Sequence, residues 1–179
     1  MGRNVVYCAM SLDGFIARRD GDVRWLAAAG TGSEEVGDVL TFAAFLRGVG
    51  AIVMGRRSFD VVRSFGPSVW PYGETPLLVA TRRPLAEDGP GRVQAVRGDI
   101  GALCAQARHI AGDADVYIDG GDIVSQALDA NLIDALWVTQ APVLLGEGVR
   151  LYQGAALHAF HAQPLGSLRG MSQILLRPR

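Results

Sequence analysis

The sequence has few cysteines, no long hydrophobic run and no excess of charge of either sign. Its two cysteines, Cys8 and Cys104, have no second cysteine or histidine at metal-binding spacing, so we expect reduced core thiols and no metal site. The 17 basic and 18 acidic side chains give a net charge of -1, which provides no global attraction for nucleic acid or an anionic membrane. We therefore expect neither of these partners.

No stretch approaches the roughly 18 apolar residues that a membrane-spanning helix needs. The apolar run before Ser11 is also too short for a signal peptide, so a cytoplasmic location is expected. The chain has 179 residues, of which 49% are hydrophobic and 20% charged, and this is the profile of a soluble globular protein. We expect one domain over residues 1–179, since two domains of this total length would have small cores.

Apolar strand patterns alternate with helix patterns along most of the chain. The strand patterns cover residues 4–10, 51–54, 76–80, 92–98, 115–118, 135–146 and 172–178. The helix patterns cover residues 56–65, 100–110 and about 121–128. A further helix is expected from a cap at Ser33 to about Arg47, because Glu34 and Glu35 suit a helix N-terminus. The alternation predicts an α/β fold with a largely parallel sheet and an antiparallel final pair of strands.

Three of these strands end in similar turns, namely VMGRRS at residues 53–58, VATRR at 79–83 and IDGGD at 118–122. In open α/β sheets, ligands bind at the carboxyl ends of strands, where helix N-termini direct N–H groups at anions. Glycine allows close approach to a phosphate, and hydroxyl and guanidinium groups donate to its oxygens. Any one of these turns, taken alone, is as consistent with a simple connection between two elements as with a ligand site. Together they predict a phosphate-rich ligand at Gly55, Arg56, Arg57, Ser58, Thr81, Arg82, Gly120 and Gly121.

The pattern Gly-x-Gly-x-x-Gly is absent, which argues against an ordinary Rossmann domain. No acidic residue is placed to hold a free ribose 2′-hydroxyl, whereas clustered arginines suit the 2′-phosphate of NADP. Aromatic residues are candidates for the walls of an aromatic substrate site, although buried aromatics more often belong to the core. These candidates are Trp25, Phe59 and Trp70.

Four stretches resemble the dihydrofolate-reductase-like superfamily, and specifically the reductase domain of the bifunctional riboflavin-pathway deaminase-reductases. They are AMSLDGFIA, AIVMGRRSFDVV, PLLVATR and VYIDGGDIVSQAL…NLIDALWVTQAPVLLGEG, in the family's order over residues 5–152. The resemblance implies a three-layer α/β/α fold with a central mixed, mostly parallel sheet and an antiparallel C-terminal hairpin. It also implies an NADPH-dependent reductase of a small pteridine- or pyrimidine-like substrate, of the type of dihydrofolate reductase or 5-amino-6-(5-phosphoribosylamino)uracil reductase.

The resemblance assigns roles to individual residues. Ala9 and Ile16 would flank the nicotinamide, and residues 55–58 would hold phosphates at a helix start. Thr81 and Arg82 would reach the adenosine 2′-phosphate. The Gly120–Gly121 turn would lie against the pyrophosphate, where a side chain would keep the cofactor away, and Asp122 and Ile123 would open the next helix. Asp13, in the loop beside the nicotinamide, is the candidate proton donor.

The chain departs from the resembled families at the substrate. The acidic residue that dihydrofolate reductases carry after the tryptophan matched by Trp25 is missing, which disfavours reduction of folate itself. The lysine that riboflavin-pathway reductases carry in their first strand is Tyr7 here. An NADP- or flavin-nucleotide-binding protein without turnover is therefore the alternative. A homodimer is expected because related domains pair and because residues 135–146 form a long apolar strand pattern.

Overall fold

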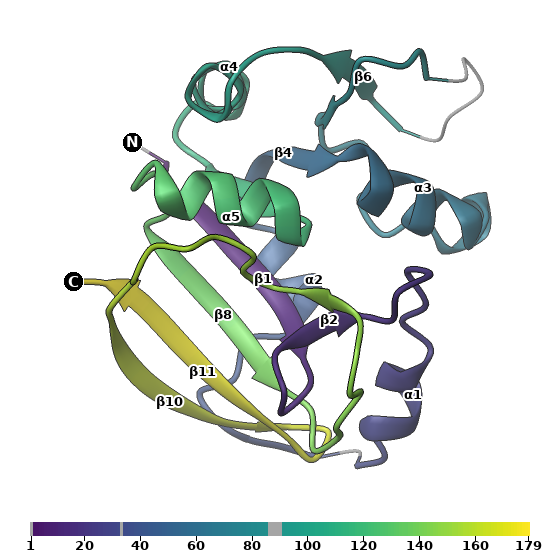
Figure 1. Cartoon of the computed structure of the whole chain (residues 1–179), viewed down its shortest axis with the longest axis vertical. Helices are drawn as coiled ribbons and strands as arrows, with labels where there is room; N and C mark the ends of the chain where they lie inside the picture. Colours follow the sequence, from purple (N-terminus) through teal and green to yellow (C-terminus); the bar gives the residue numbers. More distant parts are fainter. Residues whose placement is uncertain (1, 33, 86–90) are drawn as a thin grey trace.

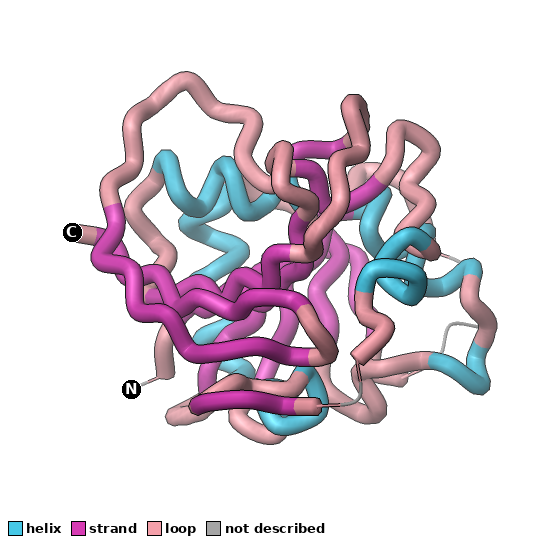
Figure 2. Tube along the Cα trace, turned by 90° about the horizontal axis from the view of Figure 1, so that it is seen from below, coloured by secondary structure: helices cyan, strands magenta, loops and turns pink. Residues whose placement is uncertain are grey.

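The computed structural model of the chain describes residues 2–32, 34–85 and 91–179. Within these ranges a mixed sheet crosses the molecule, with helices packed on both of its faces (Figure 1, Figure 2). Its strands are, in spatial order, β3 (Glu35–Gly37), β10 (Phe160–Leu168), β11 (Met171–Pro178), β8 (Ala135–Gln140), β1 (Asn4–Met10), β7 (Asp115–Asp119), β4 (Val49–Gly55), β5 (Leu77–Ala80) and β6 (Val93–Val96). A separate antiparallel pair consists of β2 (Phe15–Ala17) and β9 (Val149–Arg150). The helices are α1 (Trp25–Ala29), α2 (Phe42–Leu46), α3 (Arg56–Ser64), α4 (Ile100–Ala111) and α5 (Gly121–Asp129), with a 3₁₀ turn at Pro67–Val69.

The strands from β8 through β6 are parallel, and β11, β10 and β3 extend the sheet in antiparallel fashion. Helices cover both faces of the parallel part, so its central strands are largely apolar rather than alternating. Strand β4, for example, has the sequence VGAIVMG, and five of its seven residues are buried. This is the predicted α/β architecture, and the β10–β11 pair is the predicted C-terminal hairpin.

The core has two parts, one on each face of the sheet. On one face, α4 and α5 pack their buried residues, such as Leu103 and Val124, against the strands. On the other face, Phe45 from α2 packs edge-on against Tyr117, and Phe59 from α3 belongs to the same buried cluster. The helices therefore fix the strand ends from both sides, and the turns that follow β4, β5 and β7 are held in place by the core.

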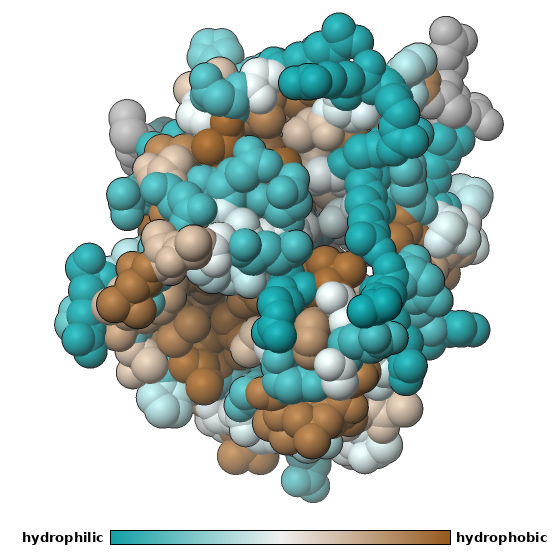
Figure 3. All heavy atoms as spheres, in the orientation of Figure 1, coloured by the Kyte–Doolittle hydropathy of each residue, from teal (hydrophilic) through white to brown (hydrophobic). Residues whose placement is uncertain are grey.

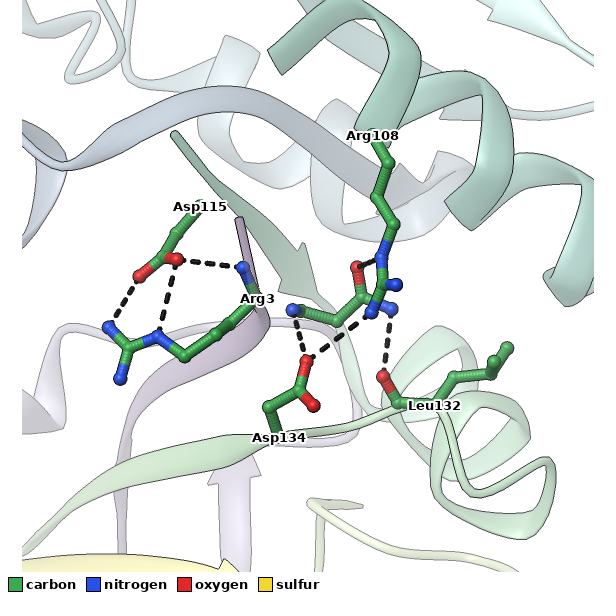
Figure 4. A network of polar contacts seen from close by, with 6 residues as sticks. Arg3, Arg108, Asp115, Leu132 and Asp134 are labelled. Carbon is green, nitrogen blue, oxygen red and sulfur yellow. Dashed lines mark hydrogen bonds and ion pairs between the residues drawn. The ribbon is translucent and has the colours of Figure 1, made fainter. Parts of the chain in front are cut away.

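A network of polar contacts ties the amino ends of the central strands together (Figure 4). The Arg3 guanidinium and backbone N–H both donate to the Asp115 carboxylate, at 2.6 Å and 2.8 Å. Asn4, which is fully buried, donates from its backbone to Asp134 and from its side chain to the Leu132 carbonyl. Arg108 of α4 completes the network through Asn4 Oδ1 and Asp134. These contacts set the register of β1 against β7 and β8 at the end opposite the loops discussed below.

The helix expected from Ser33 to Arg47 is wrong. Residues 35–37 form the edge strand β3, which pairs with β10, and the helix α2 occupies only residues 42–46. Its cap is Thr41, whose hydroxyl accepts from the Ala44 N–H at 3.2 Å. The expected cap at Ser33 lies outside the described residues. Acidic residues after a serine resemble a helix start, but here they belong to a strand stabilised by a distant partner.

The strand expected over residues 135–146 is shorter, because β8 ends at Gln140. Pro142 has no N–H to continue a ladder, and the Val143 N–H instead donates to the Ala141 carbonyl at 2.8 Å. Strand β8 lies between β1 and β11, so both of its edges are already paired. Residues 152–170, which carry weak periodicity, include the strand β10. Among the described residues, no helix is long and apolar enough to cross a membrane.

Candidate functional site

Two cavities adjoin at the carboxyl ends of the parallel strands. The larger has a volume of about 990 Å³ and is lined by residues 55–58, 80–83, 96–99 and 120–123 together with Leu103, Gln126, Val149 and Gln153. The smaller has a volume of about 320 Å³ and lies between β1, β2 and α3. We call them the arginine cleft and the apolar chamber. Arg57, Ser58, Gly120, Gly121 and Val149 line both, so the two cavities share a wall.

The floor of the arginine cleft is formed by the starts of two nine-residue helices. Helix α3 begins directly after β4, with Gly55 at its cap position, and α5 begins directly after β7, with Gly120 at its cap position. Neither glycine offers a side chain to cap the first N–H groups of its helix. Those N–H groups and the positive ends of both helix dipoles therefore favour an anion in the cleft. The three predicted turns do converge on one cavity.

The two glycines at the start of α5 are required by the protein's own packing. Gly120 has φ +92°, in the left-handed region, and a Cβ atom on it would overlap the Ser58 hydroxyl. A Cβ atom on Gly121 would overlap the backbone oxygen of Arg150. Sequence reasoning attributed these glycines to contact with a cofactor. The structure gives a further reason, because α3, α5 and β9 meet here with no room for a side chain.

The arginines of the cleft fall into two groups. Arg56 donates to Asp60 at 2.7 Å and to the Pro84 carbonyl at 3.0 Å, and Arg57 donates to the Arg19 carbonyl, so both hold neighbouring loops. The second group, at the outer edge of the cleft, is exposed and consists of Arg82, Arg83 and Arg97.

Sequence reasoning missed Arg83 and Arg97. Arg97 follows β6 as Arg82 follows β5, and its guanidinium donates to the Arg82 carbonyl at 2.9 Å. Among the described residues, five arginines line the cleft against two aspartates, Asp99 and Asp122. A band of hydrophilic atoms runs over the region between α3 and α5 in Figure 3. The cleft therefore has the charge that a polyphosphate requires.

The apolar chamber contains one carboxyl group, Asp119, which sequence reasoning also missed. Asp119 is the last residue of β7; its side chain is half-buried, and its Oδ1 accepts from the Gly120 N–H at 2.8 Å. Burial raises the pKa of this carboxyl above its ordinary value, although the Gly120 N–H and the Tyr117 and Tyr72 hydroxyls act in the opposite direction. The Asp119 carboxyl therefore keeps its proton to higher pH than an exposed aspartate.

Two further polar groups lie beside Asp119. The Tyr117 hydroxyl donates its proton to the backbone carbonyl of Tyr7 at 2.9 Å. Burial raises the pKa of the Cys8 thiol to about 12, so that this thiol is neutral at physiological pH. The chamber thus combines apolar walls with one carboxyl group of raised pKa.

The residues predicted to bind a cofactor all line one of the two cavities. Ala9 and Ile16 line the apolar chamber, and the cleft is lined by Gly55, Arg56, Arg57, Ser58, Thr81, Arg82, Gly120, Gly121, Asp122 and Ile123. The Thr81 hydroxyl accepts from the Arg83 N–H at 3.1 Å, which shapes the turn after β5. Their roles in binding stay predictions.

The aromatic residues predicted to contact substrate lie elsewhere. Trp25 is buried with Ala141 and Met171 in a small separate cluster. Phe59 is 1% exposed in the core, and Trp70 packs edge-on against it with ring centroids 6.3 Å apart. None of the three lines either cavity. This placement favours the alternative given for them, namely core packing.

Asp13, the predicted proton donor, holds a loop. Its carboxylate accepts from the Ser11 hydroxyl at 2.6 Å, from the Leu145 N–H at 3.1 Å and from the Gly146 N–H at 2.7 Å. The Ser11 hydroxyl and the backbone N–H donors lower the pKa of Asp13 to about 2. A carboxyl with this pKa is ionised at neutral pH and has no proton to give. Asp13 lines neither cavity, so the geometry favours a structural role.

Comparison with solved structures defines the class of protein. The dihydrofolate reductase of Enterococcus faecalis complexed with NADP(H) superposes with a TM-score of 0.61, over 99% of this chain and 97% of that chain, at 12% sequence identity. A Shewanella sp. PV-4 protein named for riboflavin biosynthesis superposes with a TM-score of 0.83 over 99% of both chains, at 31% identity. The fold is therefore the dihydrofolate-reductase-like α/β fold, as the resemblance implied.

Sequence comparison gives the family. The family model described as the RibD C-terminal domain matches residues 67–176. The uncharacterized protein YwjB of Bacillus subtilis (strain 168) is 30% identical over 152 residues, which cover 84% of this chain and 82% of that protein. The chain belongs to the RibD C-terminal domain family, and it is an oxidoreductase of the kind that acts on heterocyclic substrates.

Proposed function

We propose that this protein is a reductase that uses NADPH to transfer a hydride to a small heterocyclic substrate. The observation that carries the proposal is the wall shared by the two cavities at Ser58, Gly120 and Gly121. A polyphosphate in the arginine cleft and a flat ring in the apolar chamber would meet at this wall. One molecule that joins a ring to several phosphates, as a dinucleotide does, would extend from the cleft into the chamber and meet the substrate there.

The residues present fit NADPH. The unpaired N–H groups at the starts of α3 and α5 suit the pyrophosphate, and the exposed Arg82, Arg83 and Arg97 suit a third phosphate at the outer edge. Such an edge would distinguish NADPH from NADH, which lacks the 2′-phosphate. When bound, NADPH supplies the hydride, and the protein's task is to orient the reactants and exclude water.

The chain's own residues then perform two tasks in the chamber. Ala9 of β1 and Ile16 of β2 provide small apolar walls beside the place expected for the nicotinamide. Asp119 lies in the same chamber, and burial raises the pKa of its carboxyl, which suits a group that gives a proton. We assign to Asp119, rather than to Asp13, the role of proton source for the substrate.

The direct test is calorimetric titration of the purified protein with NADPH and, separately, with NADH. Saturable binding of NADPH that is at least about tenfold tighter than binding of NADH is expected, because charge-assisted contacts to a phosphate contribute roughly 1.5–3 kcal/mol each. Absence of NADPH binding would overturn the proposal. A protein that bound NADPH but oxidised none of it with any member of a heterocycle panel would instead be a binding protein without turnover.

We also propose a cytoplasmic homodimer built from single domains over residues 1–179. Strand β8 is paired on both edges, so the dimer would not form by adding a strand to it. Hydrophobic atoms gather in a hollow over β8 and β11, below α5, in Figure 3. The nearby loop exposes 94% of Leu157. Light scattering at micromolar concentration tests this state, and a monomer would contradict it.

A further inference from the structure

The apolar chamber restricts the chemistry of what it can hold. Apart from Asp119 and Arg57, the described residues that line it are uncharged. Most are apolar, among them Ala9, Ile16, Leu26, Val61 and Phe65. The surface offered to a ligand is therefore mostly apolar.

The single basic residue among the described residues of this lining, Arg57, belongs to the wall that the chamber shares with the arginine cleft. The Arg57 guanidinium donates to the backbone carbonyl of Arg19 and lies at the wall shared with the arginine cleft. The N–H groups at the start of α5 belong to the same shared wall. Helix α1, at the other end of the chamber, has five residues and contributes Leu26.

Two arginines in the segment between the lining residues Ala17 and Leu26 are paired with acids. Arg19 contacts Glu147 at 3.1 Å, and Arg24 forms two hydrogen bonds to the Asp22 carboxylate, both at 2.9 Å. Arg18 is exposed and does not line the chamber. Burying a phosphate without N–H or cationic partners is strongly unfavourable. A phosphorylated substrate would therefore have to leave its phosphate outside the described lining.

Asp119 is the one carboxyl among the described residues of the chamber lining. In its protonated form this carboxyl presents a donor and an acceptor side by side, which matches the N–H and C=O edge of a lactam or the related edge of an aminopyrimidine. The remainder of such a ring would contact apolar side chains.

Building on the proposed function, we infer that the substrate is an uncharged heterocycle without a phosphate group, with one polar edge facing Asp119 and an apolar remainder. A chamber of about 320 Å³ lies at the lower end of the roughly 300–1,000 Å³ typical of ligand sites, which suits one or two fused rings. This substrate class differs from that of a phosphoribosyl-pyrimidine reductase. The nearest phosphate-binding groups serve the cofactor, in the adjoining cleft.

Three fluorescent probes that differ in one feature at a time test the inference. They are 6,7-dimethyllumazine, 6,7-dimethyl-8-ribityllumazine and the 5′-phosphate of the latter, titrated into the protein with saturating NADP⁺. The unphosphorylated probes are expected to bind at least about tenfold more tightly than the phosphate, because the phosphate has no partner in the chamber. Equal or tighter binding of the phosphate, or no binding of 6,7-dimethyllumazine at millimolar concentration, would overturn the inference.

Matched variants locate the binding. Val61→Asp places a charge in the chamber and should weaken 6,7-dimethyllumazine at least about tenfold, and Ala17→Asp, on β2, provides a second variant should the first not fold. Val69→Asp is the control, since Val69 is 55% exposed and outside both cavities, and it should leave the affinity unchanged.

NADPH titration of the wild type separates the two proposals. Failure of NADPH to bind overturns the proposed function, whereas the wrong probe order with normal NADPH binding overturns only the substrate class.

Discussion

Gly121 lies directly against the backbone carbonyl of Arg150, and this contact joins the start of α5 to strand β9. A Cβ atom at residue 121 would overlap the Arg150 oxygen. The wall between the arginine cleft and the apolar chamber therefore depends on the absence of a side chain here, whether or not a ligand is bound.

Gly121→Ala is expected to destabilise the protein by roughly 1–3 kcal/mol, because the Arg150 backbone must move to admit the methyl group. Gly48→Ala is the matched control, since its added carbon would lie 3.6 Å from its nearest neighbour, the Phe45 oxygen. The control should change stability by no more than about 0.5 kcal/mol. Urea unfolding measures both, and equal stability of the two variants would contradict the packing argument.

Removing the exposed arginines should change the choice between cofactors. Arg82→Ala and Arg97→Ala should each weaken NADPH binding by about tenfold or more, because each charge-assisted contact to a phosphate contributes roughly 1.5–3 kcal/mol. The affinity for NADH, which lacks that phosphate, should change much less. Arg177→Ala, at an exposed position on β11 outside the cleft, is the control. A parallel loss for both cofactors would mean that these side chains do not recognise the 2′-phosphate.

Asp119 should titrate above the ordinary aspartate pKa of 3.8. Carbon-13 NMR of the aspartate carboxyls can identify its resonance as the one missing from Asp119→Asn. The same shift predicts a pH effect on stability. Because the folded pKa exceeds the unfolded one, the wild type should lose stability relative to Asp119→Asn as pH rises from about 3.8 through the folded pKa. An Asp119 that titrated below 3.8 would remove it as a proton source.

Asp13→Ala should destabilise the protein, because the variant removes the acceptor for the Leu145 and Gly146 N–H groups. The Asp13 pKa is lowered from 3.8 to about 2, so its stabilising effect is present above pH 3.8 and is lost as pH falls toward 2. Thermal unfolding of wild type and variant should therefore differ at pH 7 and converge in acid. Glu74→Gln, which alters one exposed carboxylate, controls for charge. NADPH binding to Asp13→Ala at the level of wild type would agree with a structural role.

The sequence predicted the central strands and the convergence of their turns, because both depend on local patterns. Strands β4 and β7 are short apolar runs, and the glycines that follow them mark turns in any context. Strand β3 was not predictable in this way, since its stability comes from pairing with β10, about 130 residues away. The stretch around Glu35 carries no strand pattern of its own.

The residues of the candidate site were predictable where they directly follow strands. They were not predictable where burial decides the role of the side chain. Arg97 is the first residue after β6, in register with Thr81 after β5, but the sequence pattern had placed it inside a strand over residues 92–98. Asp119 stands within the IDGGD stretch, but only its burial beside Tyr117 shows that its carboxyl is unusual. Trp25 has the aromatic side chain expected of a residue that lines a substrate site. Its actual position, in a separate apolar cluster, depends on contacts that the local sequence does not encode.

The order of the strands has a consequence for how fast the molecule reaches its native state. Strand β11 separates β10 from β8, so the edge formed by β10 and β3 joins the sheet only through residues 171–178. Chains dominated by contacts between distant residues fold slowly, because loop closure precedes the stabilising contact. Strand β3, whose partner β10 is distant in sequence, should therefore acquire protection from hydrogen exchange later during refolding than the local β10–β11 hairpin.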